Sequence, residues 1–106
     1  SSEEDFSSET TVVMDEGVYV DFDRRDEPFA IEIIDVSQKL NLKADKIYRS
    51  GIKGSIRITS DLIELKIEAV PSGPGRKNVR VLEVSAANEY GILPDKFKFT
   101  VTECVS

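Results

Sequence analysis

Residues 81–91 have the sequence VLEVSAANEYG. Apolar and polar residues alternate as far as Ala86, and the run ends in Asn-Glu-Tyr-Gly. Alternation with a period of two is typical of a strand that buries one face and exposes the other. Asn88 tolerates a left-handed conformation and Gly91 has no Cβ to clash at positive φ, so the polar ending predicts a turn.

The same alternation recurs along most of the chain, between short groups of Gly, Pro, Asp and Asn that favour turns. The predicted strands are residues 11–14, 18–22, 29–35, 55–59, 63–70, 79–86 and 97–103. Segment 36–49 is ambiguous and fits either a helical turn followed by a strand or two short edge strands. This number and spacing of strands predicts an all-β fold, a two-sheet antiparallel Greek-key β-sandwich formed by residues 10–106. Residues 1–9, SSEEDFSSE, are too polar to bury a core and are predicted to be a flexible acidic linker or tail.

Composition limits the function. The chain has 106 residues, enough for one domain, and a net charge of −6, which argues against binding nucleic acid or an anionic membrane. No run is long and apolar enough to cross a bilayer. A single cysteine, Cys104, cannot form an internal disulfide. We therefore expect a cytoplasmic location, with the extracellular surface as the alternative.

Residues 55–101 resemble the intermediate-set immunoglobulin-like domain. The residues that carry the resemblance are LKIEAV at 65–70, which matches the family's L-x-I-x-x-V, and VSAANEYG at 84–91, which is similar to its C-x-A-x-N-x-x-G. In that fold the second motif ends strand F and turns the chain into the neighbouring strand G. Val84 replaces the family's cysteine, and the chain has no tryptophan, so the usual disulfide and its packing partner are absent. Apolar side chains of similar volume would keep such a core packed.

The resemblance implies a non-catalytic protein–protein interaction module, one domain of a larger scaffolding, cytoskeletal, muscle or adhesion protein, that needs no cofactor. Its partners would be other proteins or neighbouring domains, bound through loops at one end or through an unpaired edge strand. We expect Tyr90 to fold back onto the sandwich, although it remains a candidate contact residue. The candidate partner-binding residues are Arg76, Lys77, Glu89 and Tyr90.

A second hypothesis comes from DFDRRDE at 21–27, which places several carboxylates close together. Calcium takes oxygen ligands, so this segment suggests an extracellular, cadherin-like adhesion domain linked through calcium. The simpler interpretation, which we favour, is a solvated turn whose acids are neutralised by the two arginines. The candidate ligands are Asp21, Asp23, Asp26 and Glu27.

Other chemistry has less support. The chain has no histidine, so no histidine-dependent catalytic triad is possible, and Cys104 is expected to be an inert thiol at a strand end. A carbohydrate-binding accessory domain of an enzyme is a third possibility, but the shortage of aromatic residues counts against it. We expect no catalysis.

Overall fold

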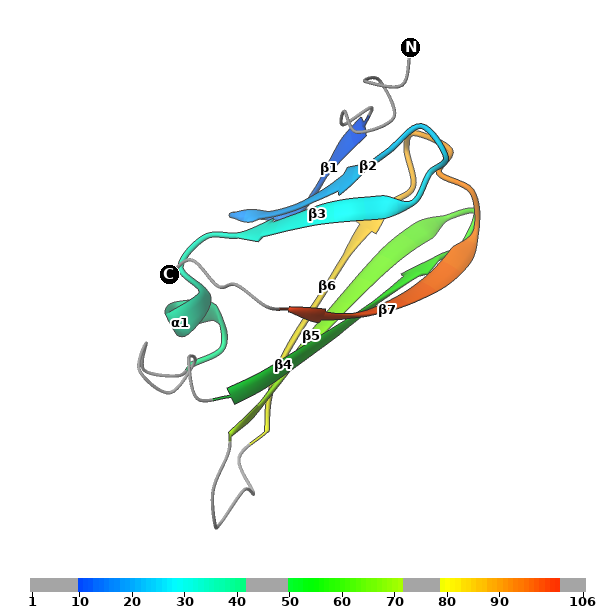
Figure 1. The fold of residues 1–106 in the computed structure, drawn as a ribbon. Helices are drawn as coiled ribbons and strands as arrows, with labels where there is room; N and C mark the ends of the chain where they lie inside the picture. The colour runs from blue at the N-terminus through cyan, green and yellow to red at the C-terminus, as the bar shows by residue number, and fades with distance from the viewer. Residues whose placement is uncertain (1–9, 42–49, 72–78, 102–106) are drawn as a thin grey trace.

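A computed structural model describes residues 10–41, 50–71 and 79–101, and these form seven strands and one short helix (Figure 1). The elements are β1 (Thr10–Asp15), β2 (Val18–Phe22), β3 (Pro28–Ile33), α1 (Val36–Lys39), β4 (Ser50–Ile58), β5 (Leu62–Pro71), β6 (Arg80–Ala87) and β7 (Asp95–Val101). Each strand predicted from the alternation is present. Helix α1 begins the ambiguous segment, whose residues 42–49 lie outside the described part, as do residues 1–9.

The strands pair in two antiparallel sheets that face each other as two layers (Figure 1). One sheet has the order β1-β2-β3 and the other the order β6-β5-β4-β7. In the larger sheet, three consecutive strands pair in sequence order, and β7 then returns to pair with β4. This is the strand order of a Greek key. The predicted two-sheet antiparallel sandwich is confirmed.

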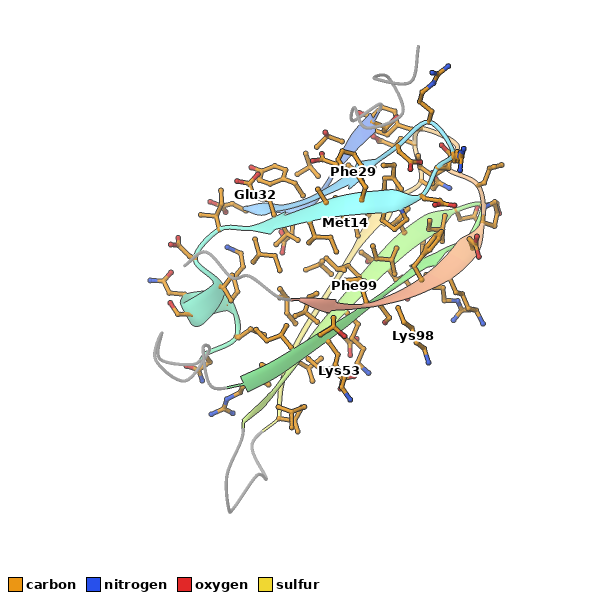
Figure 2. All side chains as sticks on the ribbon, in the orientation of Figure 1. Met14, Phe29, Glu32, Lys53, Lys98 and Phe99 are labelled. Carbon is orange, nitrogen blue, oxygen red and sulfur yellow. The ribbon has the colours of Figure 1, made fainter. Side chains whose placement is uncertain are left out.

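The core lies between the sheets, where alternate residues of each strand point inward (Figure 2). Val18, Val20 and Phe22 of β2 are fully buried from the three-stranded side. Burying such side chains contributes about 1.5–3 kcal/mol each, which makes this layer a main source of stability. From the four-stranded sheet, the buried hydrophobic residues are Ile52, Ile56, Ile58, Ile63, Leu65, Ile67 and Ala69.

Strand β6 contributes the residues in the opening stretch. Leu82, Val84 and Ala86 face inward and pack against the buried core, as their alternation predicts. They are only partly buried, and β6 is an edge strand with a neighbour on one side. Apolar side chains therefore occupy the position where the immunoglobulin-like resemblance expects a cysteine.

The pairing of the strands differs from the immunoglobulin arrangement. In that fold, strands E and F lie in different sheets and strand F shares a sheet with strand G. Here β6 pairs with β5, from Leu62 opposite Ala87 to Ala69 opposite Arg80, while β7 pairs with β4. The expectation that the opening stretch turns into a neighbouring final strand is therefore wrong. Strands β5 and β6 carry matching rows of apolar residues and pair directly, and residues 88–94 then cross from one edge of the sheet to the other.

A bulge changes one further prediction. The alternation of FAIEIID places Phe29 on the buried face with Ile31 and Ile33. The ladder between β2 and β3 instead shifts between Asp21 and Phe22, so that Asp21 lies opposite Ala30 and Phe22 opposite Pro28. The extra residue, Phe29, has no partner across the strand and its side chain is 47% exposed.

Candidate protein-interaction surface

The connection between β6 and β7, residues 88–94, is held in place by the side chain of Asn88. Its Nδ2 donates to the carbonyl oxygens of Thr59 at 2.9 Å and Ile92 at 2.8 Å, and its Oδ1 accepts from the Ile92 N–H at 2.8 Å. Gly91 has a φ of +66°, the conformation that the sequence predicts there. The side chain of Ile92 is buried and anchors the loop to the core.

The turn between β2 and β3 is joined to this loop. Asp23 Oδ1 accepts the backbone N–H groups of Arg25 and Glu27, at 2.8 and 3.0 Å, and so shapes the turn. Asp26, at a φ of +62°, directs its Oδ2 to the backbone N–H of Leu93 at 3.1 Å. Two connections far apart in the sequence therefore meet at one end of the sandwich.

This end presents large apolar side chains to solvent. Tyr90 is 63% exposed and Leu93 is 62% exposed. Glu89 beside Tyr90 and Arg25 in the joined turn are also exposed. We call these four residues the loop-end surface. An exposed tyrosine and leucine flanked by charges have the chemistry of a small contact site for another protein.

The expectation that Tyr90 packs onto the sandwich is wrong. Ile92 takes the buried position in this loop, and the Asn88 bonds fix the backbone so that Tyr90 points away. Glu89 is exposed as a loop position should be, whereas Arg76, Lys77 and Cys104 lie outside the described residues. Leu93 was not anticipated. An apolar residue directly before Pro94, in a segment that is otherwise a turn, was the signal that could have found it.

Three of the four candidate calcium ligands are held in separate roles, and the fourth, Glu27, is exposed. Asp21 lies on the outer face of the three-stranded sheet, where its Oδ1 accepts the Thr11 hydroxyl at 2.6 Å. Asp23 and Asp26 bind backbone amides, as described above. In the part of the chain that the structure describes, no three histidine, cysteine, aspartate or glutamate side chains gather as metal ligands would.

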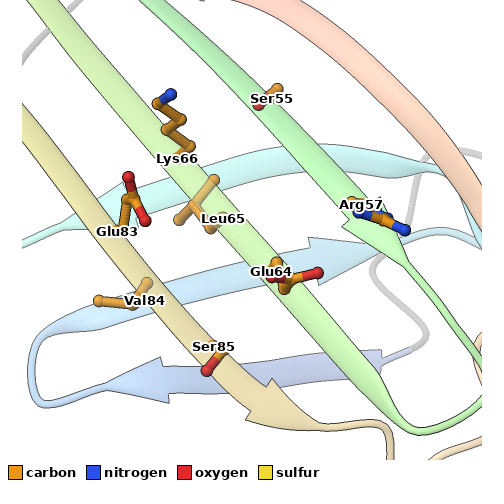
Figure 3. Close-up of a pocket in the computed structure, with 8 residues that line it drawn as sticks. All are labelled: Ser55, Arg57, Glu64, Leu65, Lys66, Glu83, Val84 and Ser85. Atoms are coloured by element: carbon orange, nitrogen blue, oxygen red, sulfur yellow. The ribbon is translucent and has the colours of Figure 1, made fainter.

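The outer face of the four-stranded sheet has a shallow hollow of about 350 Å³ (Figure 3). Its polar lining comes from β4, β5 and β6 and consists of Ser55, Arg57, Glu64, Lys66, Glu83 and Ser85. The charged residues of this face form cross-strand rows, with Arg57 opposite Glu64 and Lys66 opposite Glu83. Such rows stabilise a solvated sheet face, which is an ordinary role for these side chains.

Comparisons with protein-family models, with curated proteins and with solved structures each gave no match. Among the described residues, no helix has the length and hydrophobicity to cross a membrane.

Proposed function

We propose that this domain is a non-catalytic protein–protein interaction module that binds a partner through the loop-end surface. The observation that carries the proposal is the exposure of two large apolar side chains, Tyr90 and Leu93, on one hydrogen-bonded loop. Tyrosine is enriched among the residues that dominate binding energy at interfaces. Two exposed apolar side chains flanked by charged ones resemble, on a small scale, the apolar core and polar rim of a protein interface.

The loop is organised before any partner binds. Asn88 fixes its start to Thr59 and Ile92, and Asp26 fixes its far side through the Leu93 amide. A surface that is already ordered loses less conformational entropy on association, so more of the contact energy appears as affinity. This favours recognition by surface complementarity.

The setting of the module is a separate hypothesis. The immunoglobulin-like resemblance suggests one domain of a larger intracellular scaffolding or cytoskeletal protein, but the pairing of β6 with β5 counts against that resemblance. The interaction role does not depend on it, because any sandwich can present a loop surface at its end. No observation favours the calcium-linked alternative, since Asp23 and Asp26 are used by backbone amides.

The proposal can be tested without knowing the natural partner. Binders are selected from a displayed library of protein fragments against the wild-type domain, and their affinities are measured for Tyr90→Ala and Leu93→Ser. Because a hot-spot residue contributes about 2 kcal/mol or more, we expect each substitution to weaken most binders by at least about tenfold.

The matched control is Val13→Ser. Val13 is 60% exposed on β1, so it has the same apolar character on another part of the surface. Thermal melting of each variant checks that the fold is intact. Binders that tolerate both loop substitutions, or that depend equally on Val13, would refute the loop-end surface as the main contact site.

A further inference from the structure

The edge of β7 differs from the other sheet edges. β1 and β6 lie beside each other at one margin of the sandwich. β3 begins with Pro28 and contains the bulge at Phe29, both of which hinder strand pairing. β7 instead pairs with β4 in an unbroken register from Asp95 to Val101, and no described residue pairs with its other side. A regular edge strand directs unpaired backbone N–H and C=O groups outward.

Beyond Asp95 at its start, the inner row of β7 is apolar and incompletely covered. Phe97 and Phe99 pack against the core but stay partly exposed, as do Ile31 and Ile33 of β3, the edge strand of the facing sheet. Figure 2 shows Phe99 on the side of β7 that faces β3 and Lys98 on the opposite side. The Phe99 ring lies over Gly54, where an added Cβ would approach the ring carbon Cζ within 2.2 Å. Apolar surface therefore remains open along this margin.

The outer row of β7 is basic. Lys96 and Lys98 are exposed, and their cross-strand neighbours on β4 are Arg57 and Ser55. Neither lysine therefore faces a carboxylate, and Lys96 faces a like charge, which is unfavourable. The acids of this face are on β5 and β6, and the only ion pair among its described residues, Lys66 with Glu68 at 3.4 Å, lies within β5. The outer rows of β4 and β7 are therefore basic in a chain whose net charge is −6.

We propose that the outward edge of β7 is a second binding site, which accepts an extended peptide strand of alternating apolar and acidic residues from a partner protein. Side chains of a strand alternate between its two faces, so such a peptide meets both rows of β7 at once. Its backbone pairs with the outward edge of β7, its apolar residues cover Phe97 and Phe99, and its carboxylates lie beside Lys96 and Lys98. A second copy of β7 is a poor occupant, because it would bring lysines against lysines.

The probe is a synthetic peptide of seven residues, the length of β7, with valine or isoleucine alternating with glutamate. Binding is followed by amide chemical shifts and by hydrogen exchange of the labelled domain. We expect shifts in β7 and slower exchange of its outward amides. A peptide with lysine in place of each glutamate should bind at least about tenfold more weakly, because attraction is replaced by repulsion.

Backbone pairing is tested with two further versions of the acidic peptide, each N-methylated on one alternate set of amides. In a strand added to an edge, only one set of amides faces β7, so one version should lose binding and the other should keep it. Equal binding of both versions, or equal binding of the acidic and lysine peptides, would overturn the proposal. So would the absence of any shift in β7 at millimolar peptide.

On the domain, Lys98→Glu should weaken the acidic peptide by about tenfold, whereas Arg24→Glu, with the same charge change in the β2–β3 turn, should have little effect. Both side chains are exposed, so neither substitution should disturb the fold. Equal loss in the two variants would mean a non-specific charge effect and would refute the site. Shifts centred on Tyr90 and Leu93 would assign the peptide to the loop-end surface instead, which would support the proposed function and reject the β7 site.

Discussion

The side chain of Asn88 uses both its donor and its acceptor groups on backbone atoms of two other positions, Thr59 and Ile92. Thr59 belongs to the turn between β4 and β5, so this amide connects two turns at the same end of the sheet. Asn88 also donates its own backbone N–H to the Asp61 carbonyl at 2.9 Å. One residue therefore sets the position from which Tyr90 is presented.

Replacement of Asn88 should lower stability. Asn88→Ala removes three partly buried hydrogen bonds and leaves two backbone groups of Ile92 without this partner, so we expect unfolding to become easier by about 2–3 kcal/mol. Urea denaturation followed by circular dichroism measures the change. Asn88→Asp keeps the Oδ1 acceptor and loses the donor, so its stability should lie between those of wild type and Asn88→Ala. An alanine variant as stable as wild type would contradict this role.

Gly54 is the second residue whose identity is fixed by its neighbours. An alanine Cβ there would lie 2.2 and 2.3 Å from the Phe99 ring and 3.0 Å from Ile67 Cδ1. The ring would have to move, so Gly54→Ala should destabilise the domain by about 1–3 kcal/mol. Gly51, on the same strand, has nothing within 4 Å of the corresponding position, and Gly51→Ala should be neutral or slightly stabilising.

A double-mutant cycle identifies the cause. If the Phe99 ring is what opposes the added methyl group, Gly54→Ala should cost less in a Phe99→Leu background than in wild type. Thermal melting of the four proteins gives the coupling energy. Additive effects would show that strain elsewhere in β4 is responsible.

At the scale of elements, the β2–β3 turn is shaped by its own carboxylates. Asp23 accepts two backbone amides within the turn, and Asp26 links the turn to the β6–β7 connection. Two acids of the cluster DFDRRDE therefore have a structural role. The sequence pattern alone does not distinguish this role from metal binding.

This use predicts the response to calcium. Asp23 and Asp26 already accept hydrogen bonds from backbone amides, and the described acidic side chains do not gather around a common point as metal ligands would. Adding millimolar calcium should therefore leave the melting temperature unchanged. Magnesium at the same ionic strength is the control. A rise of several degrees with calcium alone would revive the calcium-linked hypothesis.

At the scale of the whole molecule, the sequence predicted the strands and their buried faces but not their neighbours. The alternation in residues 63–70 and 79–86 predicts which side chains point inward, and Leu82 and Val84 do point inward. It would read the same whether β6 lay beside β5 or in the opposite sheet, so the pairing could not be deduced from it.

The candidate surface was predicted only in part, for a similar reason. The loop that exposes Tyr90 is held partly by the hydrogen bond from Asn88 to Thr59, which is distant in sequence. The exposure of Phe29 depends on a register shift in the β2–β3 ladder. Neither long-range bonding nor a bulge has a signature in local periodicity.

The return of β7 to β4 also bears on how the chain folds as it is made. β4 leaves the ribosome well before β7, because β5 and β6 are synthesised between them. Until β7 emerges, the nascent sheet has an unpaired edge at β4, the strand that carries Ile52 and Ile56, which are buried in the folded domain. Completion of the larger sheet must therefore wait until β7 has been synthesised, and in that interval β7 of a neighbouring nascent chain can compete for pairing with β4.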